Sequence, residues 1–174
     1  MYTLSDFIGK EKFNKALKTF MERFRYKSSP YADIGTFVTM VKENTPDDLQ
    51  YLVDDTFSKI TLYENKAKNA SASVNEDGSY DVIFTVEAKK VYSDSTGVQT
   101  TAKLNDWLEV GIFGETIING ETTEIPILVE KVLITDSLNT FTFTVREKPI
   151  KAGIDPMSKF IDRDVDDNLI RVEL

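Results

Sequence analysis

The residues best suited to chemistry in this chain are four carboxylates near its C-terminal end, Asp162, Asp164, Asp166 and Asp167. Carboxylates at spacing i, i+2 and i+4 can converge on a hard cation such as Ca²⁺. An EF-hand loop also requires glycine at its sixth position and glutamate at its twelfth, and these positions, counted from Asp162, hold Asp167 and Glu173. Because the glycine is missing, the pattern fails. We therefore expect a solvated or arginine-paired acidic segment and assign no metal ligand.

The composition excludes most other catalytic chemistry. The 174 residues include no Cys and no His, which rules out a Ser-His-Asp triad, a Cys-His dyad, an H-E-x-x-H zinc site and disulfide bonds. Paired carboxylates for glycoside hydrolysis can be nominated among 29 acidic residues, but their separation in space decides that chemistry and no spacing marks a pair. We assign no catalytic, cofactor-binding or metal-binding residue, and no cofactor, to this chain.

Three further features have a functional and a structural interpretation. Trp107, the single Trp, follows Asp106 in an apolar segment and could stack on a sugar, but such a Trp more often packs in a core or between domains. The run Asn69-Ala70-Ser71 matches the N-glycosylation acceptor, which has meaning only in a glycosylating host. The Phe-rich stripe of the first long helix is most simply core, with an exposed docking face as the alternative.

The charge balance and hydropathy limit the partners of the chain. Twenty-one basic and 29 acidic residues give a net charge of −8, which disfavours binding to phosphate backbones. No stretch approaches the roughly 18–20 apolar residues of a spanning helix. We expect no nucleic-acid partner and no membrane insertion of this soluble segment, and its localisation stays open because a Cys-free chain suits reducing and oxidising compartments alike.

The first third of the chain has helical periodicity. Phe13, Leu17, Phe20 and Phe24 recur every three or four residues, as in an amphipathic helix. A short helical turn that ends at Gly9 precedes this helix. A second helix follows a candidate cap, Asp33. A third begins with Thr45 as the N-cap, Pro46 at the first helical position and Asp47 and Asp48 in the first turn.

Alternation replaces helical periodicity after Lys59. Residues 80–88 and 140–146 alternate apolar with polar side chains, whereas 104–113 and 125–134 are apolar on both faces and are predicted to be covered. Asn119-Gly120 is the clearest hairpin signal. The sequence predicts an α+β fold: a helical hairpin-like segment of about three helices (1–58), an antiparallel β-sandwich of about six or seven strands (59–148) and an extended C-terminal tail (149–174) with one short helical or turn element near residues 157–161.

Several segments resemble the C-terminal part of M1-family (gluzincin) zinc aminopeptidases. Residues 1–17 resemble the stretch that follows the catalytic centre in that family, and Phe24-Arg25-Tyr26 resembles the aromatic end of its next helix. Residues 45–52 resemble a later family helix, which a β-sandwich follows. Lys-Ala-Gly-Ile-Asp-Pro at residues 151–156, Ile-Asp-Arg at 161–163 and Asp-Asp-Asn at 166–168 resemble the C-terminus of a bacterial subgroup whose peptidase is joined to transporter-permease-like membrane segments.

The resemblance implies an accessory role. In the family, zinc is held by the two His of H-E-x-x-H and a downstream Glu, upstream of the stretch that residues 1–17 resemble. The family's intermediate-stabilising Tyr is also expected upstream, so this role is not assigned to Tyr2. We expect a non-catalytic C-terminal region that braces or gates an upstream catalytic domain of the same protein. Zinc is expected only in that domain, and whether the parent protein is membrane-associated stays open.

Two other functions stay open. A free-standing β-sandwich module would bind a peptide or glycan at a sheet edge or at the Trp107 face. A His-free enzyme would use carboxylates or Lys, and would need a pocket in which two acids converge with perturbed pKa values.

Overall fold

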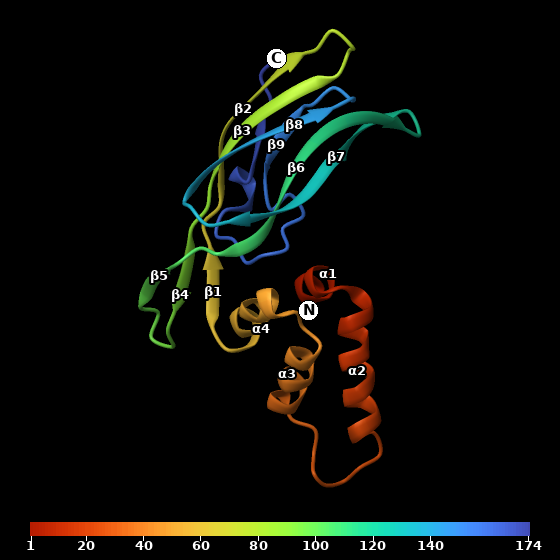
Figure 1. Ribbon diagram of the computed structural model, residues 1–174, viewed down its shortest axis with the longest axis vertical. Coiled ribbons are helices and arrows are strands. Elements are labelled where there is room, and N and C mark those ends of the chain that lie inside the picture. Colours follow the sequence, from red (N-terminus) through yellow and green to blue (C-terminus); the bar gives the residue numbers. More distant parts are fainter. The chain divides into compact units, whose positions relative to one another are not determined.

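The computed structural model describes residues 1–174 and has the predicted α+β class, with helices first and antiparallel strands after them (Figure 1). The chain divides into two compact units. The helical unit comprises Met1–Thr61 and Ser93–Gly97, and the sandwich unit comprises Leu62–Tyr92 and Val98–Leu174. No helix is long and apolar enough to cross a membrane.

The helical unit contains four α-helices where about three were predicted. They are α1 (Tyr2–Ile8), α2 (Lys10–Phe24), α3 (Ile34–Glu43) and α4 (Gln50–Phe57), with a 3₁₀ turn, η1 (Asp47–Leu49), before α4. The additional helix is the short turn before Gly9. Gly9 has φ +99° and joins α1 to α2 without a continuous helix, a backbone conformation that glycine adopts without steric cost.

The Phe-rich stripe of α2 is core only in part, because Phe13 is buried whereas Leu17, Phe20 and Phe24 are half-buried. The Phe20 ring contacts Phe24 and Phe37, with centroids 5.0 and 5.3 Å apart. Phe37 of α3 also meets Phe57 of α4 edge-on at 6.0 Å. These aromatic contacts therefore link α2, α3 and α4.

One predicted helix cap is confirmed and another is wrong. Asp33 caps α3, since its carboxylate accepts a hydrogen bond from Thr36 N at 2.8 Å. Thr45 does not cap the next helix: its buried hydroxyl donates to the Val41 carbonyl at 2.7 Å. Because Thr45 lies so close to the end of α3, its side chain bonds back to that helix, and the chain enters α4 through η1.

Ten strands form three sheets, more than the six or seven predicted. Their orders are β1-β4-β5, β2-β3-β8 and β10-β9-β6-β7. The strands are β1 (Ile60–Tyr63), β2 (Lys66–Val74), β3 (Tyr80–Glu87), β4 (Lys90–Ser93), β5 (Gln99–Ala102), β6 (Asp106–Ile118), β7 (Glu121–Ile134), β8 (Leu138–Val145), β9 (Lys151–Ile154) and β10 (Leu169–Arg171). The difference arises from short strands that carry little periodicity.

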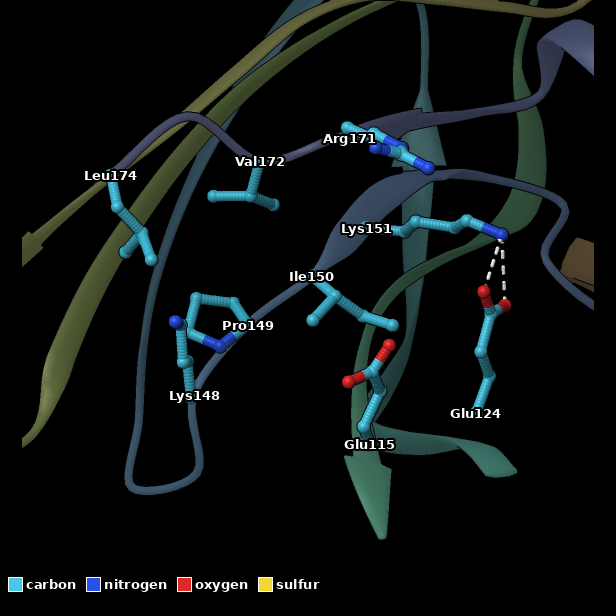
Figure 2. A pocket seen from close by; sticks show the side chains of 9 residues that line it. All are labelled: Glu115, Glu124, Lys148, Pro149, Ile150, Lys151, Arg171, Val172 and Leu174. Atoms are coloured by element: carbon cyan, nitrogen blue, oxygen red, sulfur yellow. Dashed lines mark hydrogen bonds and ion pairs between the residues drawn. The ribbon is translucent and has the colours of Figure 1, made fainter. Parts of the chain in front are cut away.

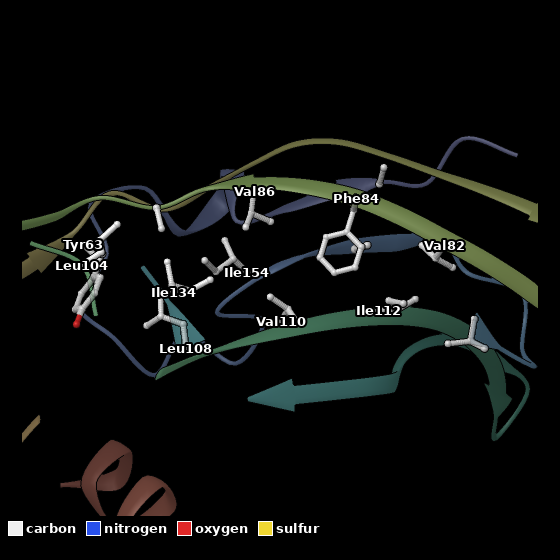
Figure 3. Close-up of a cluster of buried hydrophobic side chains, with 14 residues drawn as sticks. Tyr63, Val82, Phe84, Val86, Leu104, Leu108, Val110, Ile112, Ile134 and Ile154 are labelled. Atoms are coloured by element: carbon white, nitrogen blue, oxygen red, sulfur yellow. The ribbon is translucent and has the colours of Figure 1, made fainter. Parts of the chain in front are cut away.

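The sandwich core lies between the β3 and β6 sheets (Figure 3). Alternate residues of β3 point into it, and so do alternate residues of β6, while β9 adds Ile154. The fully buried members include Val82, Phe84, Val86, Leu108, Val110, Ile112 and Ile154. This two-residue period is the one that sheet pleating imposes on a half-buried strand.

The Asn119-Gly120 hairpin is confirmed and joins β6 to β7. Both residues have positive φ, +54° and +86°, as a type I′ turn requires. β6 is a covered inner strand as predicted, but the prediction for residues 125–134 is wrong, because β7 ends its sheet and is mostly half-buried or exposed. Pro126 is compatible with this edge position, since it lacks a backbone donor.

Residues 149–174 are part of the sandwich, because β9 and β10 pair within its four-stranded sheet. β9 lies between β10 and β6 in the four-stranded sheet. The predicted turn near residues 157–161 is present where Ser158 N donates to Asp155 O at 3.0 Å. The one helical element is a 3₁₀ turn, η2 (Val165–Asp167), further along.

Candidate functional site

Gly153 of β9 lies directly against the backbone of Asn168. A Cβ at Gly153 would lie 1.9 Å from the Asn168 carbonyl oxygen. That carbonyl accepts a hydrogen bond from Ile154 N at 3.0 Å, and Gly153 pairs with Leu169 of β10. Close backbone approach therefore requires glycine here and fixes the path of residues 168–171 across β9.

Asp155 organises the turn that follows β9. Its side chain is 1% exposed, and its carboxylate accepts hydrogen bonds from Lys159 N at 2.9 Å and Phe160 N at 3.1 Å. Burial raises the pKa of Asp155 above its ordinary value, with smaller contributions from the negative charges of Asp162 and Glu109, while the two backbone donors act in the opposite direction. Its backbone has φ +43°, a conformation that Asp and Asn tolerate better than most residues.

A buried ion pair ties the same turn to β6. Lys159 Nζ lies 2.5 Å from Glu109 Oε1, and both side chains are about 95% buried, with exposed fractions of 6% and 5%. Glu109 O accepts a hydrogen bond from Asp155 N at 2.8 Å. These contacts position the tail; they do not surround a space for a substrate.

Asp162 connects the tail to the β1–β2 connection. Its carboxylate accepts hydrogen bonds from Asn65 N at 3.0 Å and Asp164 N at 3.2 Å. Burial is the largest influence on the pKa of Asp162 and raises it, while these donors act in the opposite direction. Asp162 and Tyr63 also form an isolated parallel β-bridge.

A small cleft of about 220 Å³, here called the tail cleft, lies at this junction. Lys66 binds Asp167 at 2.9 Å, and Glu64 binds both Lys89 at 2.6 Å and Arg163 at 2.7 Å. The residues that line it are Glu64, Asn65, Lys66, Glu87, Lys89, Asp162, Arg163, Asp164 and Asp167.

The four acidic residues singled out in the sequence are thus in different environments. Asp162 is half-buried, Asp167 pairs with Lys66, and Asp164 and Asp166 are exposed, as in the solvated alternative of the expectation. No group of three or more His, Cys, Asp or Glu side chains is arranged to hold a metal ion.

A second cleft, here called the terminal cleft, has a volume of about 340 Å³ (Figure 2). Lys151 binds Glu124 at 2.7 Å across it, whereas Lys148 and Arg171 form no ion pair. Pro149, Ile150, Val172 and Leu174 give it an apolar part, and Glu115 completes the lining. Cations beside apolar surface could bind the carboxylate end of a peptide.

Sequence reasoning missed a second buried ion pair. Lys90 Nζ lies 2.9 Å from Asp106 Oδ1, with side chains 2% and 3% exposed, and Tyr63 Oη donates to Asp106 Oδ2 at 3.3 Å. The sequence feature that could have revealed this pair is a single charged residue within an otherwise apolar strand, as at Lys90 and Asp106. The neighbouring Trp107 is half-buried on β6, and Asn69 is exposed on β2.

Comparison with known proteins identifies no family for this chain. No protein-family model matches the chain, and no curated protein matches it.

Proposed function

We propose that this chain is a non-catalytic C-terminal accessory region of an M1-like zinc aminopeptidase. Its partner is the catalytic domain of the same protein, upstream of this region, which it braces or to which it limits access. Zinc and the catalytic residues belong to that domain, because a chain without His cannot supply the family's ligand set.

The observation that carries this proposal is the structural role of the tail motif that resembles the family. A Cβ at position 153 would lie 1.9 Å from the Asn168 carbonyl oxygen, so only glycine fits there. Asp155 stabilises a buried turn because its carboxylate accepts hydrogen bonds from two backbone N–H groups. Asp162 holds the β1–β2 connection through Asn65 N. The motif residues therefore have architectural functions, which are those of an accessory region.

The order of elements gives further support. Helices that continue a catalytic domain and precede a β-sandwich are what the family resemblance implies, and here four helices precede the strands of the sandwich unit. The aromatic contacts of the helical unit give it a packed core of its own.

The test is to read the source gene upstream of the codon for Met1 and assay the encoded protein. We expect the reading frame to continue into an H-E-x-x-H helix, and the longer protein to hydrolyse an aminoacyl-p-nitroanilide in a zinc-dependent manner. Residues 1–174 alone should give no zinc-dependent turnover. Turnover by residues 1–174, or an upstream frame without a zinc motif, would refute the proposal.

The terminal cleft favours one alternative function, a peptide-binding module. Lys148 and Arg171 offer cations without acidic partners next to Pro149, Ile150 and Val172. This alternative predicts that short peptides with a free carboxylate bind residues 1–174, and that Arg171→Gln weakens the binding measured by calorimetry. Equal binding of peptides with a free and an amidated C-terminus would contradict it.

A further inference from the structure

The tail cleft and the adjoining Asn168 contain a concentration of buried polar atoms without hydrogen-bond partners. The whole chain has seven such side-chain atoms, and five of them belong to Asn65, Asp167 and Asn168. Asn65 and Asn168 are each 2% exposed. The Asn65 carboxamide has no hydrogen-bond partner, whereas the Asn168 carboxamide contacts the Asp162 carboxylate and leaves its own oxygen unpaired. Buried polar groups are normally satisfied, so this concentration calls for a ligand.

Two of these residues, Asn65 and Asn168, contact the Asp162 carboxylate. Asp162 accepts a hydrogen bond from Asn65 N at 3.0 Å, and the Asn168 side chain lies close enough to influence the Asp162 carboxylate. Asp167 Oδ2 binds Lys66, while Asp167 Oδ1 is buried and unpaired. Asn65, Asp162 and Asp167 thus line one cleft, although their segments are about a hundred residues apart in the sequence, and Asn168 contacts Asp162 beside it.

We propose that Asp162, Asp167, Asn65 and Asn168 form a calcium-binding site. The donor atoms are oxygens of carboxylates and carboxamides, which hard cations prefer. Calcium is favoured over magnesium because it accepts irregular arrangements of oxygen ligands, whereas Mg²⁺ requires a near-octahedral shell. The site is independent of the proposed accessory function.

The charge of the surroundings also favours a cation. Five acidic and three basic residues line the tail cleft. The basic groups are already engaged, Lys66 by Asp167 and both Lys89 and Arg163 by Glu64. Only two carboxylates belong to the proposed ligand set, so the affinity should fall in the weak range of about 10⁻⁴–10⁻³ M.

The site differs from the EF-hand pattern that the sequence fails to match. Asn65 belongs to the β1–β2 connection, and Glu173, at the twelfth position, pairs with β2 through backbone hydrogen bonds to Ala70 and Ala72. A search for a contiguous loop would not have found this arrangement.

Calorimetric titration of residues 1–174 with CaCl₂, and with MgCl₂ at matched ionic strength, tests the proposal. We expect one Ca²⁺ per chain with saturation in the submillimolar to millimolar range, and binding of Mg²⁺ at least about tenfold weaker. Thermal unfolding monitored by Trp107 fluorescence should shift upward with Ca²⁺ and saturate over the same range. No saturable heat with Ca²⁺ up to 10-fold above the expected dissociation constant (~10 mM) would overturn the proposal.

Two variants that remove the same charge from the same run separate coordination from charge screening. Asp167→Asn should weaken Ca²⁺ binding about tenfold or more, whereas the control Asp166→Asn, at an exposed position, should leave it within about twofold. Equal weakening by both variants would show nonspecific attraction to a chain of net charge −8 and would refute the site. If Asp167→Asn does not fold, Asn65→Asp serves instead: an added carboxylate ligand should tighten binding, and unchanged or weaker binding would count against the proposal.

Discussion

The Gly153→Ala substitution tests the idea that the tail holds its path through direct backbone contact. An alanine Cβ would lie 1.9 Å from Asn168 O, whereas ordinary contacts begin near 3.4 Å. Either the β9 backbone or the Asn168 carbonyl must therefore move by about 1.5 Å. The clash is with backbone and not with the flexible end of a side chain, so the strain cannot be relieved by a change of rotamer.

The expected loss of stability follows from this displacement. Overpacking against a rigid group costs about 1–3 kcal/mol. Displacement also weakens the hydrogen bond from Ile154 N to Asn168 O, worth about 1 kcal/mol. The lower entropy of the unfolded alanine chain offsets about 0.5 kcal/mol. We expect the free energy of unfolding of the sandwich unit to fall by about 1.5–3.5 kcal/mol.

Urea denaturation followed by Trp107 fluorescence measures this loss, because the only Trp lies on β6 of the sandwich unit. Gly78→Ala is the matched control: Gly78 has φ +84° in the β2–β3 connection, and its Cβ would meet nothing within 4 Å. It should cost only about 1 kcal/mol, from backbone conformation. A loss for Gly153→Ala no larger than for Gly78→Ala would refute the reasoning.

Three further predictions concern buried groups. The pKa of Asp155 is raised in the folded state, so the stability it contributes is complete below its ordinary value of 3.8 and is lost as the pH rises through the folded pKa. Asp155→Asn replaces one of the two acceptor oxygens by an NH₂ group, so it should cost about 1–3 kcal/mol. Its deficit relative to the wild type should be larger near pH 4 than at pH 7, and a difference independent of pH in urea titrations would contradict this. Lys159→Met leaves Glu109 buried without its ion-pair partner and should lower the free energy of unfolding by about 3–5 kcal/mol, measured by Trp107 fluorescence. The double variant with Glu109→Leu should restore much of this loss. Failure of the second substitution to restore stability would show that lost packing dominates. Phe37→Ala removes the ring that links α2, α3 and α4, and should lower the stability of the helical unit by about 3–5 kcal/mol, measured by far-UV circular dichroism. Phe37→Leu should cost less. Equal losses for the two variants would contradict a role of this ring in packing.

Local sequence signals predicted the local structure well. Asp33 and Asn119-Gly120 act within a few residues, and the structure places a helix cap and a hairpin at these positions. Thr45 carries the same local signal as Asp33, but its hydroxyl bonds to the preceding helix. A nearby backbone carbonyl can therefore bind a Ser or Thr side chain in place of the helix that follows, and the residue type alone does not show which of the two occurs.

The candidate sites depend on distant segments and were largely invisible in the sequence. Lys159 and Glu109 are fifty positions apart, and Asp162 bonds to a residue ninety-seven positions away. The requirement for glycine at position 153 comes from the backbone of Asn168, which no pattern around Gly153 reveals. Single charged residues in apolar strands marked Lys90, Asp106 and Glu109, but this signal did not mark Lys159, which lies outside the strands.

The place of β9 in its sheet has a consequence for biosynthesis. Because β9 lies between β10 and β6, the growing chain emerges from the ribosome with β6 and β7 able to pair while the other edge of β6 stays open. The helical unit, which rests on contacts between nearby segments, can fold earlier. A message truncated before residue 151 would encode a sandwich without an inner strand, and we expect proteases and chaperones to recognise that product as unfinished.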